Sequence, residues 1–451
     1  MIIPIFKKGD PSSPNNYRPI SLTSSFSRIL ELIIYDKILN HFLTLNLFSP
    51  NQFGFLPLRS SCAQMLVSLY DWYKNFCKHI TTYIIYTDIQ KAFDSVNHRK
   101  LLLILQSYGV NNTLLNWVKN FLSDRLQSVV IDESMSSHCQ IDSGIPQGSI
   151  LGPLLFFIYI NGIDICAKPI QGTGGLRLFA DDAKFFSSNP SNLQSSLNLL
   201  TNWLQEYQLR LAKEKCSVVS ILRSNLNPSF FLENSQISTS ETIKDLGIII
   251  SDNLKWNKHI DYLYRNASVS SYQISKFSKT KNIWTLIKLY KTYVRPKLEF
   301  NTPIWSPYLS KDIEKIEKIQ KTFTRYIFKK LNLPYSSYSD RLRQINLKSL
   351  EYRRLFFDLV FLYKIINGLA GINFHDYFVI KENPYMLREN HFEIESNFKS
   401  FNSIWNNSFF TRAPKLWNSL PKTITDSKSL LSFKTTLNKF NLCSVATLRF
   451  Q

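Results

Sequence analysis

Three acidic residues have the types and the spacing needed to bind metal ions. Asp88 directly follows residues 83–87, a β-branched and aromatic run that is typical of a buried strand. Asp181 and Asp182 are adjacent and lie between two short strand-like runs, which predicts a β-hairpin with both acids at its tip. Neighbouring carboxylates repel each other and are costly beside apolar strands unless cations neutralise them. A third acid from another strand completes a set of oxygen ligands for divalent cations, which can catalyse phosphoryl transfer.

Each of these acids could instead have a purely structural role in a turn, without binding metal or taking part in catalysis. An Asp-Asp pair is common in turns, because aspartate side chains bond to nearby backbone groups. Asp88 could in the same way cap the turn that follows its strand. The sequence around the acids is therefore needed to choose between the two explanations.

The elements that must position the acids alternate between helices and strands as far as about residue 250, which indicates the α+β class. Apolar residues at helical spacing predict helices at 27–42, 60–76 and 98–108. A glycine-rich loop at 143–153 leads into an apolar helix. Beyond residue 252 the sequence predicts helices rich in Lys, Tyr and Leu.

The segment 311–329 is the clearest of these later helices, because it separates apolar from basic residues. A basic helical face is either simply solvated or in contact with phosphates. The apolar side carries Ile313, Ile316, Ile319, Phe323 and Tyr326, and the basic side carries Lys311, Lys315, Lys318, Arg325 and Lys329.

The composition favours a folded protein that binds a polyanion. The 451 residues include 54 Lys and Arg against 33 Asp and Glu, a net charge of +21, and 44% of them are hydrophobic, which excludes intrinsic disorder. Nucleic acid and anionic membrane are the first candidates for the partner. The longest apolar run, 150–160, is about half a bilayer span and contains Gly152 and Pro153, so we expect buried core and no membrane partner.

The cysteines and the N-terminus favour an intracellular location, in the nucleus or the cytoplasm. No cleavable secretory signal is expected at the N-terminus. The six cysteines form no Cys-x-x-Cys pair, so reduced thiols are expected and structural zinc is not. They are Cys62, Cys77, Cys139, Cys166, Cys216 and Cys443.

The surroundings of the acids resemble a known enzyme family. Residues 179–182, Phe-Ala-Asp-Asp, resemble the Phe/Tyr-x-Asp-Asp box of reverse transcriptases. Residues 87–94 resemble the first catalytic-acid motif of that family, and residues 144–149 resemble its Pro-Gln-Gly motif, in the family's order. Residues 16–22, 52–55 and 245–247, and the tail at 412–421, resemble the non-LTR retrotransposon branch (LINE, jockey/CR1-like).

The resemblance implies a role for particular residues. Asp88, Asp181 and Asp182 match the acids that bind two Mg²⁺ ions. Lys215 matches a lysine that protonates the pyrophosphate leaving group. Phe93 matches the aromatic side chain that blocks a ribose 2′-OH, although an ordinary core aromatic would look the same.

Further matches concern the substrate. Gln147 and Gly148 match the loop along the incoming nucleotide and template. Arg59 matches a basic residue that meets the triphosphate, or is an ordinary surface arginine. The turn made by Asp245, Leu246 and Gly247 matches the primer grip.

The resemblance also implies an architecture and partners. The expected fold is a right-hand polymerase, with fingers and palm at 1–251, a helical thumb at 252–335 and a helical basic region at 336–451. The implied activity is RNA-directed DNA synthesis from dNTPs, with an RNA template and a DNA primer. The resemblance also implies an endonuclease in full-length proteins of this branch, and we expect a missing domain or a separate protein to supply that activity.

Two alternatives remain open at this point. Leu56 and Ala212 stand where many relatives carry Arg or Lys and Asn, which would suit a catalytically decayed nucleic-acid-binding protein. A group II intron maturase would keep the same acids, but the motifs outside the catalytic core point away from it. The intact acids favour an active polymerase.

Overall fold

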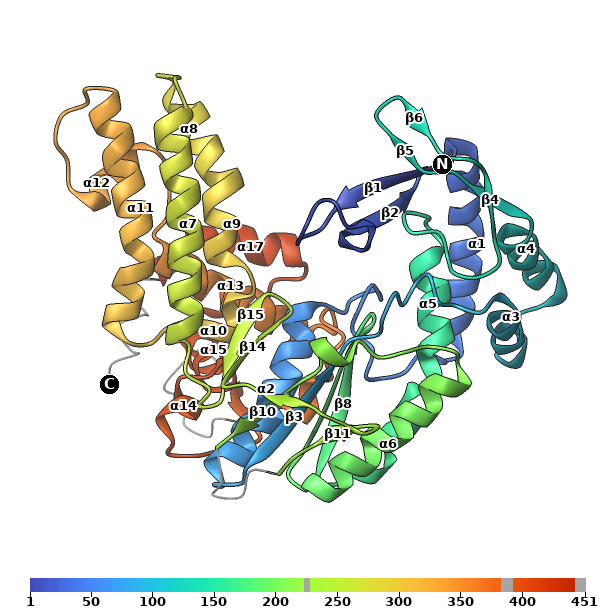
Figure 1. Ribbon diagram of the computed structural model, residues 1–451. Coiled ribbons are helices and arrows are strands. Elements are labelled where there is room, and N and C mark those ends of the chain that lie inside the picture. Colours follow the sequence, from blue (N-terminus) through green and yellow to red (C-terminus); the bar gives the residue numbers. More distant parts are fainter. Residues whose placement is uncertain (223–227, 383–391, 443–451) are drawn as a thin grey trace. The chain divides into compact units, whose positions relative to one another are not determined.

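The computed structural model describes residues 1–222, 228–382 and 392–442 (Figure 1). The chain divides into two compact units. The first comprises Met1–Leu56, Thr82–Val218 and Asn225–Thr239, and the second comprises Pro57–Thr81, Val219–Ser224 and Ser240–Gln451. Cys443 lies outside the described residues, and the other five cysteines are free thiols.

A five-stranded sheet organises the first unit. Its strand order is β13-β10-β3-β9-β8, and β9 pairs antiparallel with both β3 and β8. The central β3 is β-branched and aromatic, and residues 82–85 are buried, as the sequence predicts. The strands are β3 (Thr82–Thr87), β8 (Gly174–Phe179), β9 (Asp182–Ser187), β10 (Ser217–Ile221) and β13 (Ser238–Thr239).

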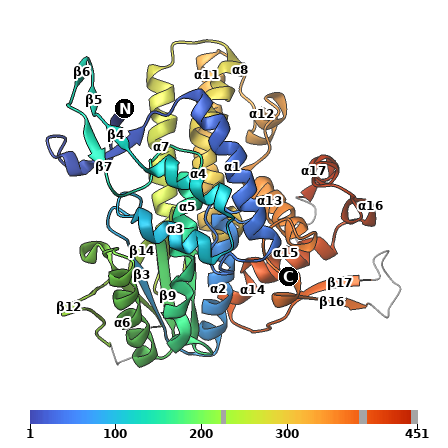
Figure 2. The same ribbon diagram turned by 90° about the vertical axis from the view of Figure 1, so that its right-hand side faces the viewer.

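Helices α1, α3, α4 and α6 of the first unit begin at side chains that cap them. Ser24, Asn97, Asn111 and Asn189 each accept a hydrogen bond from a backbone N–H of the first turn. Helix α6 packs against β9, and α3 packs against α5 (Figure 2). The helices are α1 (Ser25–Thr44), α3 (His98–Ser107), α4 (Asn112–Leu122), α5 (Gly152–Ile160) and α6 (Pro190–Glu206), with 3-10 turns at η1 (Pro14–Asn16), η2 (Asn161–Ile170) and η3 (Lys213–Lys215).

Short hairpins complete the first unit. The pairs are β1 (Ile2–Phe6) with β2 (Tyr17–Ser21), β4 (Arg125–Gln127) with β7 (Cys139–Ile141), β5 (Val130–Ile131) with β6 (Ser134–Met135), and β11 (Phe231–Leu232) with β12 (Ser235–Gln236).

The apolar run around α5 lies in the core of the first unit. Every side chain from Leu154 to Ile160 is at most 3% exposed, which confirms the expected burial. Among the described residues one helical stretch, Gly152–Ile170, has the length and hydropathy of a membrane span, and 61% of its most apolar window is buried inside the structure. Burial of this kind is typical of a core helix.

The second unit is mainly helical. Helix α7 packs against α9 and α11, side by side in Figure 1. The elements in this part are α2 (Ser61–Cys77), the hairpin β14 (Thr242–Asp245) with β15 (Ile248–Ser251), α7 (Asn257–Phe277), α8 (Ile283–Leu289), a π-helical turn η4 (Tyr290–Val294), α9 (Arg295–Glu299), α10 (Thr302–Trp305) and α11 (Ser310–Lys330).

The C-terminal part of the second unit is held by a buried ion pair. The Arg412 guanidinium donates to both carboxylate oxygens of Asp358, at 2.8 and 3.0 Å, so the motif at 412–421 has a structural role. The elements are α12 (Tyr338–Gln344), α13 (Leu350–Ile366), η5 (Phe374–Asp376), β16 (Phe378–Glu382), β17 (Phe392–Ser396), α14 (Ser403–Asn406), α15 (Phe409–Asn418), α16 (Lys422–Thr425) and α17 (Leu430–Lys439).

The observed elements confirm the α+β class. The helices expected at 27–42, 60–76 and 98–108 correspond to α1, α2 and α3, each within about two residues at either end. Segment 311–329 forms α11, where Ile316, Ile319 and Phe323 are buried. The division into fingers and palm, thumb and C-terminal region at residues 251 and 335 stays a prediction about function.

Candidate active site

Asp88 is held at the end of β3 by backbone bonds to a distant segment. Its carbonyl accepts from Ala212 N at 2.8 Å, and Gln90 N donates to Arg210 O at 2.7 Å. These bonds bring the turn η3 alongside β3. As a result, Lys215 Nζ donates to Asp88 Oδ2 at 2.6 Å.

The hairpin β8–β9 carries the other two acids, but not as the sequence predicts. Phe179 pairs with Asp182, so the two-residue loop consists of Ala180 and Asp181, and Asp182 is the first residue of β9. The prediction that both acids lie at the tip is therefore wrong for Asp182, because the strand register reaches it. Ala180 has φ 56°, a left-handed conformation that costs a non-glycine residue about 1–2 kcal/mol.

The site acids and Lys215 interact electrostatically. Burial raises the pKa of the Asp181 carboxyl, and the nearby charge of Asp88 raises it further, whereas Lys7 and Lys215 oppose the rise. The hydrogen bond to Asp88 raises the pKa of the Lys215 ammonium, so Lys215 stays protonated at neutral pH. The site therefore combines mutually repelling carboxylates with a fixed cation.

The donor chemistry of the pair Asp88 and Asp181 fits a hard divalent cation. In residues 1–222, 228–382 and 392–442, no three His, Cys, Asp or Glu side chains are grouped so as to hold a metal by themselves. Mg²⁺ is commonly bound by one or two carboxylates together with substrate phosphates and water. A cation held by these carboxylates would offset both the burial and the repulsion that raise the pKa of Asp181.

The loop at 144–149 packs beside the segment that follows Asp88. Gln147 Nε2 donates to Asp94 Oδ1 at 2.9 Å, and Gln147 O accepts from Ser21 N at 2.7 Å. Gly148 has φ 103°, and a Cβ built on it would lie 3.1 Å from Ser21 O. Position 148 therefore favours glycine for two reasons: the backbone has a positive φ, and a side chain would crowd the Ser21 carbonyl.

Phe93 lies next to the same loop. Its carbonyl accepts from Ile145 N at 2.9 Å, and its half-buried ring stacks on Phe156 with 4.7 Å between centroids. The ring thus packs on Phe156, and the residue as a whole is partly exposed. This arrangement is compatible with both of the roles expected for Phe93.

A buried carboxylate anchors the start of α5. Glu31 on α1 is fully buried and accepts from Ile150 N at 2.8 Å and from Leu151 N at 3.2 Å. Both donors lie just before the first turn of α5, and a negative charge at a helix N-terminus is favourable because of the helix dipole. Glu31 therefore fixes the helix end that follows Gln147 and Gly148.

The remaining predicted site residues belong to the second unit. The hairpin β14–β15 turns at Leu246 (φ 45°) and Gly247 (φ 87°), with Asp245 buried and paired to Ile248. The segment 245–247 is thus a tight turn, and its role as a primer grip stays a prediction. Arg59 is half-buried, and burial lowers the pKa of its guanidinium.

The two residues that depart from the family pattern are buried in the first unit. Leu56 is 6% exposed and belongs to the hydrophobic core. Ala212 is 2% exposed, and it binds Asp88 through its backbone N–H rather than a side chain. Neither substitution disturbs the bonds that hold Asp88.

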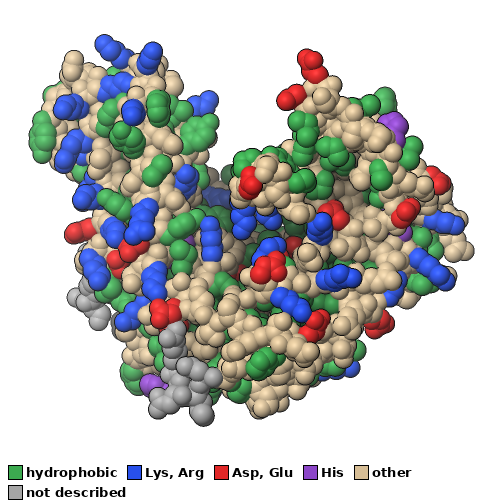
Figure 3. Space-filling model, viewed as in Figure 1, with side chains coloured by type: hydrophobic (Ala, Val, Ile, Leu, Met, Phe, Trp, Pro, Cys, Tyr) green, Lys and Arg blue, Asp and Glu red, His purple; other side chains and the backbone are tan. Residues whose placement is uncertain are grey.

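A basic face covers part of the second unit. Figure 3 shows Lys and Arg side chains over the region of α7, α8 and α11. On α11, Lys311, Lys318, Lys321, Arg325 and Lys329 are exposed.

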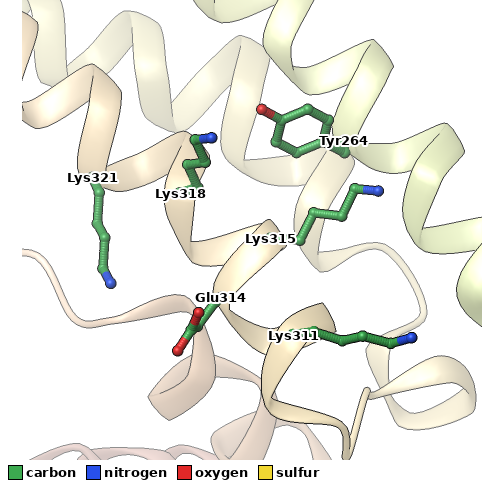
Figure 4. Close-up of a pocket in the computed structure, with 6 residues that line it drawn as sticks. All are labelled: Tyr264, Lys311, Glu314, Lys315, Lys318 and Lys321. Carbon is green, nitrogen blue, oxygen red and sulfur yellow. The ribbon is translucent and has the colours of Figure 1, made fainter.

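A pocket of about 470 Å³ lies on this face. Lys315 Nζ lies 5.6 Å from the centroid of the Tyr264 ring and 2.5 Å from Asp261 Oδ1. Figure 4 shows Lys311 and Lys315 extending to the side of Tyr264, whereas Lys321 and Glu314 point the other way. The lining residues are Tyr264, Lys311, Glu314, Lys315, Lys318 and Lys321.

Sequence reasoning missed three residues that shape the site. Asp94 was visible as the last residue of the motif at 87–94, but only the structure shows that it binds Gln147. Glu31 looks like an ordinary helical acid, because its partners lie about 120 residues away. The charge of Lys7 lowers the pKa of Asp181. No sequence motif predicts an effect of this kind.

Comparison with known proteins identifies relatives of the chain. The family described as "Reverse transcriptase (RNA-dependent DNA polymerase)" matches residues 5–263. The "Probable RNA-directed DNA polymerase from transposon X-element" of Drosophila melanogaster is 25% identical over 340 residues, which cover 72% of this chain and 37% of that protein. The "RNA-directed DNA polymerase from mobile element jockey" of Drosophila funebris is 26% identical over 340 residues, with the same coverage.

The chain therefore spans less than half the length of these curated relatives. Among solved structures, apo telomerase from Candida tropicalis matches with a TM-score of 0.44 and 14% identity, over 75% of this chain and 61% of that one.

Proposed function

Because the chain belongs to the reverse transcriptase family, we propose that it catalyses RNA-directed DNA synthesis as the polymerase part of a non-LTR retrotransposon protein. The observation that carries the proposal is the cluster of Asp88, Asp181 and Lys215. In the sequence these residues match the family's motifs. In support, Lys215 donates to Asp88, and the charges of Asp88 and Lys215 both act on the pKa of Asp181.

The acids hold the metal ions in this proposal. Reverse transcriptases generally depend on divalent metal ions, and here Asp88 and Asp181 are the primary ligands of two Mg²⁺ ions, supported by Asp182. Bound there, such ions would supply Lewis-acid chemistry, lowering the pKa of the primer 3′-OH and offsetting the charge of the triphosphate. Lys215, which is protonated at neutral pH, gives a proton to the departing pyrophosphate.

The loop beside the acids handles the nucleotide. Gln147 and Gly148 lie along the dNTP and the template, where the missing side chain of Gly148 lets the backbone approach closely. The Phe93 side chain, on a residue that is only partly buried, blocks a ribose 2′-OH and so selects deoxynucleotides. Arg59 meets the triphosphate.

The second unit grips the nucleic acid. The turn at 245–247 holds the primer, and residues 252–335 act as the thumb, where the basic face of α11 meets backbone phosphates. The proposal places the protein inside the cell, in the nucleus or cytoplasm, with an RNA template and a DNA primer. Endonuclease activity comes from another domain or another protein.

The test is primer extension on an RNA template. The chain should extend an annealed DNA primer with dNTPs and Mg²⁺, and should require the RNA template. A chain that binds the primer–template duplex but incorporates no nucleotide would be the decayed remnant, and the proposed activity would be refuted.

A further inference from the structure

A short segment extends the sheet beyond β8. Phe53 N donates to Leu178 O at 2.9 Å, and Leu178 N donates to Asn51 O at 2.9 Å, so residues 51–53 run parallel to β8. This segment is fixed by Asn51 Nδ2, which donates to Asp164 Oδ1 at 3.0 Å. Gln52 is therefore held beside the strand that ends at the acidic hairpin loop.

The Gln52 side chain binds both backbone groups of Ala180. Gln52 Oε1 accepts from Ala180 N at 3.0 Å, and Gln52 Nε2 donates to Ala180 O at 3.3 Å. The same Oε1 accepts from Gly54 N at 2.8 Å. With 3% of its surface exposed, Gln52 makes these bonds away from water, where backbone groups need such partners.

The close approach of this segment requires the glycine at position 54. A Cβ built on Gly54 would lie 2.5 Å from Ala180 N, so any side chain there would push against the loop. Gln52 and Gly54 thus fit the backbone of Ala180 from one side, and together they form the Ala180 clamp.

Ala180 needs such a clamp because of its conformation. Its φ of 56° is one that alanine rarely adopts, whereas glycine adopts it freely. Ala180 directly precedes Asp181, so a relaxation of its backbone would rotate the Asp181 carboxylate. The bonds from Gln52 oppose this relaxation.

We infer that Gln52 is a positioning residue for the reaction: it holds Ala180 in the left-handed conformation and thereby aims Asp181. The inference rests on the proposed function, in which Asp181 is a metal ligand. Gln52 acts only through Ala180. Its loss should therefore slow the chemical step without weakening nucleotide binding.

Substitution by Gln52→Met tests the amide, because methionine has a similar shape and no hydrogen-bonding groups. The matched control is Gln64→Met, at a glutamine of α2 that is 1% exposed. We expect the maximal rate of nucleotide incorporation to fall about 10- to 100-fold in Gln52→Met, with the KM for dNTP within about twofold of wild type. A wild-type rate in Gln52→Met, or an equal loss in Gln64→Met, would overturn the inference.

Rescue by glycine separates positioning from a general loss of structure. Adding Ala180→Gly to Gln52→Met should restore about tenfold in rate, because glycine takes the positive φ without help. The same change should restore nothing in Asp181→Asn. If Ala180→Gly does not raise the incorporation rate of Gln52→Met, then Gln52 does not act through the conformation of Ala180, and the inference is wrong.

Hydrogen exchange at the Ala180 amide gives a readout that needs no catalysis. In wild type the amide donates to Gln52, so it should exchange at least about tenfold more slowly than in Gln52→Met. Equal exchange in the two proteins would refute the clamp even if the wild type polymerises DNA. Slower exchange in a wild type that incorporates no nucleotide would confirm the clamp and refute the proposed polymerase function.

Discussion

Lys215 Nζ lies 2.6 Å from Asp88 Oδ2, although 127 residues separate the two in sequence. The contact depends on the backbone bond between Ala212 and Asp88, which aligns the turn η3 with the end of β3. The proposed general acid is thus attached to the same carboxylate that is proposed to bind a metal ion. The charge of Lys215 also opposes the rise in the pKa of Asp181.

Replacement of Lys215 should slow the chemical step. In the variants Lys215→Ala and Lys215→Arg we expect single-nucleotide incorporation to fall roughly 100-fold, because general acid catalysis typically contributes that much and arginine does not release its proton. Rapid-quench kinetics on an RNA template would measure the rate. The control is Lys213→Ala, which removes an ion pair to Glu233 on the same turn. A normal rate in Lys215→Arg would show that only the charge matters.

The acidic limb of the pH–rate profile should depend on Lys7. Asp181 must be ionised to bind a cation, so activity is lost as the pH falls through its raised pKa. The positive charge of Lys7 lowers that pKa, so Lys7→Met should move the acidic limb to higher pH. Lys8→Met, at an exposed neighbour, serves as the control. A limb that stays in place, or moves to lower pH, would contradict the assigned coupling.

Asp94 should support nucleotide binding through Gln147. Without the 2.9 Å bond from Gln147 Nε2, the amide loses its fixed orientation, and we expect Asp94→Ala to raise the KM for dNTP about tenfold. The variant Gln147→Ala should have a similar effect, and the double variant should be little worse than either, because the residues act as a unit. Asp142→Ala, at an exposed acid nearby, is the control. Fully additive losses would show that the two residues act independently.

The exposed lysines of α11 should contribute to the salt dependence of duplex binding. The triple variant Lys311→Gln, Lys318→Gln and Lys321→Gln leaves the ion pair of Lys315 with Asp261 intact. We expect weaker binding of an RNA–DNA primer–template, and a slope of log affinity against log salt that is smaller by about 0.9 for each lost phosphate contact.

The control for this prediction replaces three exposed lysines elsewhere in the second unit, Lys422, Lys428 and Lys439, by Gln. Fluorescence anisotropy at several salt concentrations would measure both slopes. An unchanged slope in the α11 variant would remove α11 from the nucleic-acid surface.

Sequence patterns within single segments were enough to predict the strand that precedes Asp88 and the helix α11. The β-branched run 83–87 predicts β3 and puts Asp88 at its end, and helical spacing predicts α11 with its buried Ile316 and Phe323. These features follow from side-chain periodicity within one segment. The family motifs then identify which acids matter.

Contacts between distant segments could not be predicted in this way. The hydrogen bonds of Glu31 at the start of α5 join segments about 120 residues apart, and no sequence pattern within either segment predicts them. The position of Asp182 was wrong for a different reason. A two-residue loop can be placed one position along the chain without changing the alternation of the strands, and the observed register, with Phe179 opposite Asp182, fixed that choice.

The most direct test of the central claim compares wild type with Asp181→Asn in primer extension on an RNA template with Mg²⁺. Asparagine keeps the shape of the side chain and removes the charge. We expect wild type to extend the primer, and Asp181→Asn to bind the same duplex with similar affinity but to lose at least about 1,000-fold in the rate of incorporation. Wild-type extension by Asp181→Asn would contradict the assignment of the active site.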